Sequence, residues 1–297
     1  MSRFEPFPCF LLLFAAPIWD ASNEIRKGDF TVPKSLDHIQ VVDWNIDRGT
    51  RLNQIAYVLA REAPDLCLLQ ETDLFAHRSG NLNIAEELAR RLKLNYVFAP
   101  EFRELSQGVG GEPAYQGQAI LTRLPIGSVR ILRFRTQSGF WQPHYLLPNW
   151  PLTQRRIGGR IALVVELETA HGKVLVYNAH LESRSLGRIQ TLQLEEILAD
   201  TKRYPPDTAI MLTGDLNTKY NAGNFETKLR EAGWRSAFGG RTPRTHRLIG
   251  SLDWLLVHGP VEIEGARVLK RAGGSDHFPI SAGLLLSRSR GGPKATP

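Results

Sequence analysis

The hydrophobic and polar positions of the chain follow two rhythms, one typical of strands and one typical of helices. Residues 39–44 are rich in β-branched and aromatic side chains and predict a strand, whereas the apolar positions of residues 50–63 recur at helical spacing. Pro64 predicts the end of this helix, because proline disfavours helical geometry in the residue before it. Further helices are predicted over 82–92 and 185–201, and further strands over 65–70, 96–98, 118–122, 160–166, 173–178, 208–213, 252–257 and 278–284.

Two internal stretches show neither the strand nor the helix periodicity. Residues 103–116 are rich in glycine and polar residues and predict a loop. Residues 136–159 predict a long ordered excursion whose aromatic residues are expected to pack onto their own domain, with base stacking or contact with a lipid surface as alternatives. The aromatic residues of this excursion are Phe140, Trp141, Tyr145 and Trp150.

Many short strands and few helices, without a strict βαβ alternation, favour two packed β-sheets with helices on the outside. The sequence contains no internal repeat. We therefore expect a monomer with one domain over residues 36–286, preceded by an N-terminal segment over 1–35. The tail over 287–297 is basic and rich in glycine and proline, which predicts disorder.

The composition is that of an ordinary globular domain with a mild excess of positive charge. Hydrophobic residues make up 42% and charged residues 23% of the chain, and the formal net charge is +7. This excess suits a phosphate-bearing partner, although a solvated basic surface explains it equally well. The two cysteines, Cys9 and Cys67, exclude a disulfide framework and a cysteine-based zinc site, and Cys67 lies in an apolar run typical of a buried strand.

The N-terminus bears on the location of the protein. Residues 9–16 are apolar and could form the core of a signal peptide, which would make the protein secreted or periplasmic. Glu5, Pro6 and Pro8 interrupt the usual basic lead-in, and no clear cleavage site precedes Asn23, so a cytoplasmic protein is favoured. No apolar run reaches the length of a transmembrane helix.

Charged and amide residues stand with unusual regularity at the ends of the predicted apolar strands. A carboxylate beside a buried strand is costly unless it is paired, hydrogen-bonded or bound to a cation. Each of these residues alone is more often a turn or cap residue, but their recurrence at six strand ends favours one shared polar site. The residues are Asn45, Glu71, Asn178, His180, Asp215, Asn217, Asp253, Asp276 and His277.

The residue types in this set suit metal-assisted phosphate chemistry. Carboxylates are hard oxygen ligands that suit Mg²⁺ or Mn²⁺ rather than zinc, and a divalent ion can neutralise a phosphoryl group and lower the pKa of water. Histidine can hold or protonate a charged oxygen, and a neighbouring aspartate fixes its tautomer. The i, i+2 spacing of Asp215 and Asn217 points both side chains the same way if the segment is extended.

Seven short motifs, taken in order, resemble those of the endonuclease/exonuclease/phosphatase superfamily over residues 39–286, nearly the whole chain. Each motif alone is weak evidence, whereas the Gly-Asp-x-Asn and Ser-Asp-His strings together are strong evidence. The resemblance implies a four-layer α/β sandwich, with two packed and mostly antiparallel β-sheets flanked by helices. The motifs are Trp44-Asn45, Leu69-Gln-Glu71, Gln118-Ala-Ile-Leu-Thr-Arg123, Tyr177-Asn-Ala-His-Leu181, Gly214-Asp-Leu-Asn217, Leu252-Asp-Trp254 and Gly274-Ser-Asp-His-Phe-Pro279.

The resemblance also implies roles for the polar residues and a cofactor, Mg²⁺ or Mn²⁺. Glu71 would bind the metal, and Asn45 would help to position it. Asp215 would orient or deprotonate the attacking water, and Asn217 would contact the phosphate. The implied metal residues are Asn45, Glu71 and Asp276, and the implied catalytic residues are His180, Asp215, Asn217, Asp253 and His277.

The resemblance further pairs Asp276 with His277 at the scissile phosphate and makes Asp253 a support for a histidine or for the metal. His180 lies in an Asn-x-His-Leu string that is similar to deoxyribonucleases, sphingomyelinases, inositol polyphosphate phosphatases and deadenylases rather than to abasic-site endonucleases. Gln118 stands where many relatives have Asn, which leaves a phosphate contact there open. The residues before Asp253 depart from the Arg-Ile-Asp form common in nucleic-acid enzymes, which weakens a specific DNA assignment.

A basic loop lies just before Asp253 and would line the mouth of the site. Its side chains could bind successive phosphates of DNA or RNA, and a solvated loop is an equal alternative. A second basic cluster follows the aromatic excursion. The loop residues are Arg241, Arg244, His246 and Arg247, and the cluster residues are Arg155, Arg156 and Arg160.

Three classes of function follow, in the order in which the sequence favours them. The first is a metal-dependent hydrolase that cleaves a phosphodiester, as a nuclease does, by metal- and Asp/His-assisted attack of water. The second is a hydrolase of phospholipid headgroups or inositol phosphates. The third is a non-catalytic binding protein, which is disfavoured because every expected polar position is occupied and a degenerate copy would usually have lost some.

Overall fold

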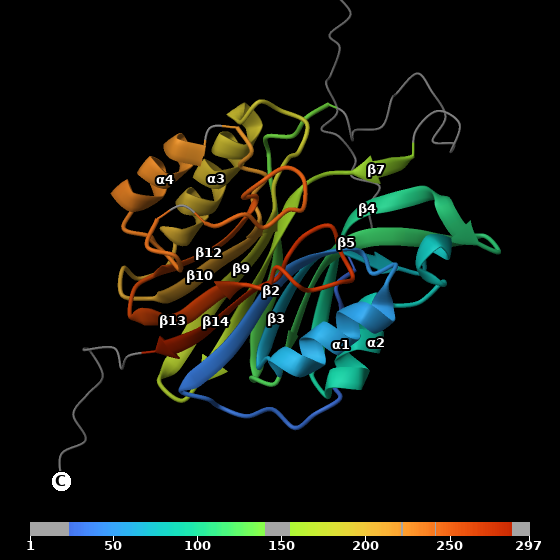
Figure 1. Cartoon of the computed structure of the whole chain (residues 1–297), viewed down its shortest axis with the longest axis horizontal. Helices are drawn as coiled ribbons and strands as arrows, with labels where there is room; N and C mark the ends of the chain where they lie inside the picture. The colour runs from blue at the N-terminus through green and yellow to red at the C-terminus, as the bar shows by residue number, and fades with distance from the viewer. Residues whose placement is uncertain (1–23, 140–154, 221, 241, 287–297) are drawn as a thin grey trace, which may run out of the picture.

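The computed structural model of the protein describes residues 24–139, 155–220, 222–240 and 242–286. These residues form four layers, in which two β-sheets pack face to face and helices cover both outer faces (Figure 1). Helices α1 (Leu52–Glu62) and α2 (Ile84–Leu92) pack on the outer face of one sheet, and α3 (Arg188–Thr201) and α4 (Ala222–Glu231) pack on the outer face of the other. The predicted α/β sandwich is confirmed.

Most neighbouring strands in the two sheets are antiparallel. Across the larger sheet lie, in order, β1 (Arg26–Gly28), β4 (Asn95–Val109), β5 (Glu112–Thr122), β3 (Leu66–Leu74), β2 (His38–Arg48), β14 (Ile280–Leu286) and β13 (Val261–Val268), and β7 (Arg156–Gly158) also pairs with β4. Across the smaller sheet lie β11 (Arg235–Ser236), β12 (Asp253–His258), β10 (Ala209–Asp215), β9 (Gly172–His180), β8 (Ile161–Thr169) and β6 (Ile126–Arg133). Among these described strands, β2 with β3 and β9 with β10 are the parallel pairs.

Strand β2 shows how the two-residue alternation of a strand contributes to two cores at once. Ile39 and Val41 point into the space between the sheets and join the central core. Val42 and Trp44 point outward and pack against the residues of α1 and α2. The strand is therefore buried on both faces, which explains its nearly continuous apolar sequence.

Polar side chains replace apolar ones at one end of the space between the sheets. In β2 the inner face runs from Val41 to Asp43 and then to Asn45. In β10 the same face runs from Met211 through a threonine to Asp215. Because side chains two residues apart share a face, each strand carries its last polar residues into the same end of the sandwich.

Two bulges lie where this polar end begins. The pairing register of β2 with β3 shifts between Asn45 and Arg48, and that of β3 with β5 shifts between Leu69 and Thr72. Glu71, inside the second bulge, has a positive φ of 49°. A bulge bends the strand and redirects one side chain, so Glu71 leaves the regular alternation of β3.

Strand β10 approaches β9 closely at Gly214, next to the polar end. The φ of Gly214 is +131°, a backbone conformation that residues with a side chain rarely adopt. A Cβ atom added there would lie 2.0 Å from the carbonyl oxygen of Ala179. The glycine is therefore required by both the backbone conformation and the space, and it sets the position of Asp215, the next residue.

The structure confirms several predicted local features. Helix α1 ends at Glu62, Ala63 takes a left-handed conformation and Pro64 follows, so the proline does mark the end of the helix. Cys67 is fully buried in β3. In the part of the chain that the structure describes, no helix is both long and apolar enough to cross a membrane.

The predicted loop over residues 103–116 is wrong. Strand β4 continues to Val109 and turns through Gly110 and Gly111 into β5, which begins at Glu112. Both glycines have positive φ, +64° and +89°, so they form the tight turn of a long hairpin. The strands of this hairpin are partly exposed and polar near the turn, which is why the sequence lacks the apolar alternation of a strand there.

Three sequence predictions concern residues outside the described ranges. These are the apolar segment 9–16, the aromatic residues of the excursion at Phe140, Trp141, Tyr145 and Trp150, and the basic tail over 287–297. Within the predicted N-terminal segment, Arg26–Gly28 forms β1 and pairs with β4 of the larger sheet. The sheet therefore begins upstream of residue 36.

Candidate active site

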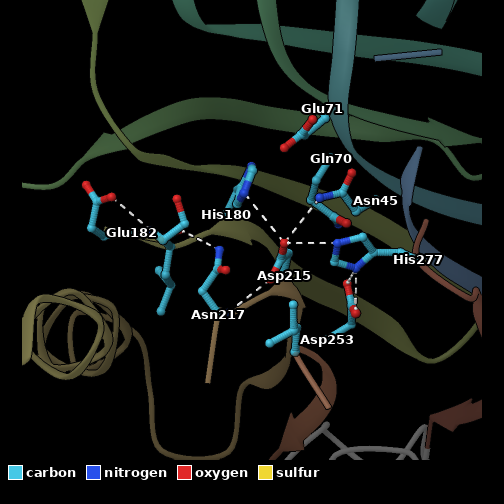
Figure 2. A network of polar contacts seen from close by, with 12 residues as sticks. Asn45, Gln70, Glu71, His180, Glu182, Asp215, Asn217, Asp253 and His277 are labelled. Carbon is cyan, nitrogen blue, oxygen red and sulfur yellow. Dashed lines mark hydrogen bonds and ion pairs between the residues drawn. The ribbon is translucent and has the colours of Figure 1, made fainter. Parts of the chain in front are cut away.

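The carboxylate of Asp215 lies at the centre of the polar end of the sandwich (Figure 2). Its Oδ2 atom accepts a hydrogen bond from Asn45 Nδ2 at 3.1 Å. The same atom lies 3.6 Å from His180 Nε2 and 3.7 Å from His277 Nε2. Asp215 is only 3% exposed. Residues of β2, β9 and β10 and of the segment before β14 therefore meet at one buried carboxylate.

His277 is held by Asp253, the first residue of β12. Its Nδ1 atom lies 2.9 and 3.0 Å from the two carboxylate oxygens of Asp253. Burial lowers the pKa of His277, but the negative charges of Asp253 and Asp215 outweigh this effect and raise the pKa to about 10. The imidazole is therefore a cation at neutral pH, and its Nε2 atom faces Asp215.

The predicted pairing of Asp276 with His277 is wrong. The Asp276 carboxylate is 52% exposed and lies 3.4 Å from Nε2 of His246, a residue that the predicted catalytic set does not contain. Asp276 and His277 both lie near His246, but the hydrogen-bond partner of His277 Nδ1 comes from β12. The resemblance implied Asp276 as this partner and Asp253 as a support for a histidine or for the metal, and the histidine that Asp253 supports is His277.

Glu71 lies beside this centre, on the bulge of β3, and its carboxylate is ionised (Figure 2). Gln116 Nε2 donates a hydrogen bond to Oε2 at 3.1 Å, and Arg48 lies 3.6 Å from the same oxygen. Burial raises the pKa of Glu71, but the positive charges of His180, Arg48 and two further arginines outweigh it and lower the pKa to about 2. Among the described residues, no donor hydrogen-bonds to the other oxygen, Oε1.

The donor atoms at this end of the sandwich fit a hard divalent cation. An ionised carboxylate with one oxygen free of described donors is a ligand type that Mg²⁺ and Mn²⁺ prefer. Glu71 and Asp276, two of the predicted metal residues, do not occur together in a group of three neighbouring ligand atoms. The described groups of three whose ligand atoms lie within 4.8 Å of one another are His246, Asp276 and His277, and Asp215, Asp253 and His277.

Asn217 does not extend the strand of Asp215. Its φ of +50° turns the backbone, so the two side chains are not presented side by side as they would be in an extended segment. The backbone N–H of Asn217 donates to Oδ1 of Asp215 at 3.0 Å, and its side-chain Nδ2 donates to the carbonyl of Leu181 at 3.0 Å. This turn fixes the second oxygen of Asp215.

A buried ion pair lies behind His180. Arg160 donates to Glu101 Oε1 at 2.7 Å, and Glu101 Oε2 lies 3.6 Å from His180 Nδ1. Arg156 pairs with Glu104 at 3.0 Å. Arg160 is therefore buried in an ion pair and Arg156 is partly buried in one, so neither side chain is freely solvated.

Three buried amides to which the prediction gives no catalytic or metal-binding role connect the two sheets beneath the site. Gln70 Nε2 donates to Asp43 Oδ1 at 2.8 Å and to Asn178 Oδ1 at 2.7 Å. Gln118 is fully buried and donates to the carbonyl of Ile161 at 2.8 Å, so it bridges the sheets. All three side chains lie on the inner faces of their strands. Because every second residue of a strand points to the same face, the alternation of the apolar core residues along each strand could have predicted them.

The arginines of the predicted substrate-binding loop are hydrogen-bonded to backbone carbonyls. Arg247 donates to the carbonyls of Ser275 at 2.9 Å and Ala272 at 2.7 Å, and Arg244 donates to carbonyls within the loop. These bonds attach the loop to the segment that carries His277. Arg241 lies outside the described residues.

The chain belongs to the endonuclease/exonuclease/phosphatase family, because the model of that family matches residues 44–277. Membership supports a hydrolase of the phosphoesterase type that depends on a divalent metal. A comparison with curated protein sequences finds no significant match.

Several solved structures share the fold at low sequence identity. An endonuclease/exonuclease/phosphatase from Beutenbergia cavernae DSM 12333 is 18% identical with a TM-score of 0.63, over 84% of this chain and 72% of that one. One from Bacteroides vulgatus is 17% identical with a TM-score of 0.61, over 84% and 99%. Truncated TDP2 of Caenorhabditis elegans is 19% identical with a TM-score of 0.54, over 84% and 97%. Identities this low show the fold alone.

Proposed function

We propose that the protein hydrolyses a phosphodiester, as a nuclease does, by metal-assisted attack of water. The observation that carries the proposal is the convergence of Asn45, His180 and His277 on one carboxylate, Asp215, at 3.1 to 3.7 Å. An amide donor and two imidazoles gathered around a buried carboxylate suit a reaction in which a water is deprotonated beside an anionic phosphorus centre.

The proposed roles follow from the contacts of each side chain. Asp215 orients the water and accepts its proton, because its Oδ2 atom is the one that His180 and His277 face. His277, a cation held by Asp253, stabilises the negative charge that develops on the phosphoryl oxygens. His180 supports Asp215 from the other side, with Glu101 behind it.

The remaining proposed roles are those of Asn217 and of the metal-binding residues. Asn217 positions Asp215 through its backbone N–H, and the N–H of its amide that is not bonded to Leu181 contacts the phosphate. Glu71 is the proposed ligand of Mg²⁺ or Mn²⁺, with Asn45 beside it and Asp276 at the exposed side of the site. When bound, the ion neutralises the phosphoryl group and lowers the pKa of water.

A second candidate substrate, a phospholipid headgroup, is favoured by one observation. The loop beside His277 exposes two neighbouring apolar side chains, Leu248 at 84% and Ile249 at 51%. Exposed apolar side chains at the rim of a polar site suit an amphiphilic substrate. For nucleic acid the supporting features are the positive net charge and Arg244 and Arg247, whose guanidinium groups are already bonded to backbone carbonyls.

A substrate panel tests the proposal. Purified protein with Mg²⁺ or Mn²⁺ is assayed on bis(p-nitrophenyl) phosphate, single- and double-stranded DNA, RNA, inositol phosphates, and vesicles that contain sphingomyelin. We expect turnover of the small diester and of an oligonucleotide, with oligonucleotide binding weakening steeply as salt rises. Hydrolysis of vesicles or inositol phosphates alone would replace the nuclease assignment by the second candidate, and no turnover on any substrate would contradict the proposal.

A further inference from the structure

A short loop that precedes β12 is hydrogen-bonded along its backbone to the segment that carries His277. Arg247 N donates to the carbonyl of Asp276 at 2.9 Å, and Phe278 N donates to the carbonyl of Thr245 at 2.6 Å. These bonds lie on both sides of His277. The position of the loop is therefore tied to the position of this histidine.

His246, within this loop, has its tautomer fixed by the backbone. The N–H groups of Leu248 and Ile249 both donate to its Nδ1 atom, each at 3.0 Å. A nitrogen that accepts hydrogen bonds carries no proton, so the proton of the neutral ring must be on Nε2. The loop thus holds His246 as an imidazole whose Nε2–H group is its donor.

The ring of His246 lies against the ring of His277. The two centroids are 4.7 Å apart and the planes are inclined at 87°, an edge-to-face arrangement. One ring nitrogen of each histidine and a carboxylate oxygen of Asp276 lie within 4.8 Å of one another. His246 is 7% exposed, so it lines the site rather than the outer surface.

The Nε2–H group of His246 is available to a ligand. It lies 3.4 Å from Asp276 Oδ2, close enough for an electrostatic contact, but the two are not hydrogen-bonded in the described structure. The proton also prevents this nitrogen from binding a metal, because a metal needs the lone pair that the N–H bond occupies. His246 is therefore better suited to contact an anion than to bind a cation.

We propose that His246 is a catalytic residue whose Nε2–H group donates a hydrogen bond to an oxygen of the phosphoryl group that His277 binds. The proposal rests on the proposed function, because it takes a phosphoester as the ligand. His277 supplies the positive charge and His246 supplies a directed neutral donor beside it.

Two substitutions separate this role from a purely structural one. His246→Gln places an amide N–H near the position of Nε2 but provides no ring nitrogen for the loop. His246→Asn places an amide oxygen near the position of Nδ1, where the N–H groups of Leu248 and Ile249 can use it, but has no donor at the site. His38→Gln, on an exposed histidine at the opposite end of β2, serves as the matched control.

The first readout is kcat/KM for bis(p-nitrophenyl) phosphate, with the melting temperature of each variant. We expect His246→Asn to lose about 10- to 100-fold while it melts near the wild type, and His246→Gln to retain more activity than His246→Asn. The His38→Gln control should match the wild type. If activity instead follows the melting temperature, with His246→Asn active and His246→Gln inactive, His246 is structural and the proposal is overturned.

The second readout does not depend on turnover. In nitrogen-detected NMR of the histidine rings, we expect His246 to be the Nε2–H tautomer, and its Nε2 resonance should shift when inorganic phosphate is added with Mg²⁺. Phosphate affinity should fall in His246→Asn and fall less in His246→Gln. If the wild type binds phosphate in this way but hydrolyses no ester, the proposed function fails while His246 stands as an anion donor. An Nδ1–H tautomer, or no response to phosphate, overturns the role of His246.

Discussion

At the scale of single residues, the imidazole of His277 lies between two carboxylates, with Asp253 on Nδ1 and Asp215 near Nε2. Its pKa of about 10 lies above the ordinary value of 6.5. The protonated His277 therefore stabilises the fold fully below about pH 6.5, as long as its aspartate partners stay ionised, and this contribution is lost as the pH rises through about 10.

Asp253→Asn should lower the pKa of His277, because it removes the charge that raises this pKa most. We expect the wild type to stay active into the alkaline range. In the pH–rate profile of the variant, the loss of activity on the alkaline side should occur at lower pH. We also expect kcat/KM to fall on the order of 10²-fold or more. The measurements are a pH–rate profile and NMR titration of His277. An unchanged His277 titration in Asp253→Asn would contradict the pairing.

Glu71→Gln should weaken the response to metal without abolishing the site. The variant loses one proposed anionic ligand, while the hydrogen bond from Asn45 to Asp215 stays in place. We expect the concentration of Mg²⁺ or Mn²⁺ needed for half-maximal activity to rise, with partial recovery at high metal. Metal titration of activity, together with calorimetric titration of the metal alone, measures the effect. A metal response identical to that of the wild type would remove Glu71 from the proposed ligands.

Residue identities at the site were more predictable than residue partners. The strand-end pattern predicted Asn45, His180, Asp215 and His277 as members of one polar site, and they meet there. The resemblance left Asp253 as a support for either a histidine or the metal, and local sequence could not decide between them because Asp253 is adjacent to His277 only once β12 has packed. His246 was assigned to a basic loop, since its fixed tautomer depends on backbone N–H groups that sequence does not show.

At the scale of elements, strands buried on both faces were predicted and irregular strands were not. The apolar sequences of β2, β3, β9 and β10 predict strands because each contributes to the central core. The partly exposed ends of β4 and β5, and β13 with few buried positions, lack that signal. The bulge at Glu71 depends on the pairing of β3 with two neighbours, so no local pattern predicts it.

Gly214→Ala tests whether the close approach of β10 to β9 sets the position of Asp215. The added methyl group would meet the carbonyl of Ala179 at 2.0 Å, on a backbone with φ of +131°. We expect a loss of roughly 2–5 kcal/mol of unfolding free energy and a large loss of activity. Gly223→Ala, in α4 with no atom within 4 Å of the added group, is the matched control and should not destabilise. Equal stability of the two variants would contradict this assignment.

The loop of Arg244 and Arg247 distinguishes a structural element from a substrate-binding one. Because Arg247 donates to the carbonyls of Ser275 and Ala272, we expect Arg247→Ala to lower the melting temperature and to reduce turnover of small and large substrates alike. Arg241→Ala, in comparison, should affect an oligonucleotide only. The log–log salt slope of binding reports each lost phosphate contact as a change of roughly 0.7–0.9. If Arg247→Ala flattens that slope and leaves the small diester untouched, the loop binds the nucleic-acid backbone.

At the scale of the whole molecule, the site exists because two sheets bring distant parts of the chain together. The hydrogen bond from Asn45 to Asp215 spans 170 residues, and that from Trp44 to the carbonyl of His277 spans 233. The layered architecture was predictable from the number and length of apolar runs. The orientation of one sheet on the other was not, since it follows from how the inner side chains pack.

The measurement that tests the account most directly is turnover of bis(p-nitrophenyl) phosphate before and after complete chelation of divalent cations. We expect activity to vanish on chelation and to return on addition of Mg²⁺ or Mn²⁺, because the carboxylates of Glu71 and Asp215 would otherwise repel an anionic substrate. Asp215→Asn, tested in parallel, should stay inactive with metal while melting near the wild type. Full activity after chelation, or near-normal turnover by Asp215→Asn, would contradict the proposed metal-dependent site.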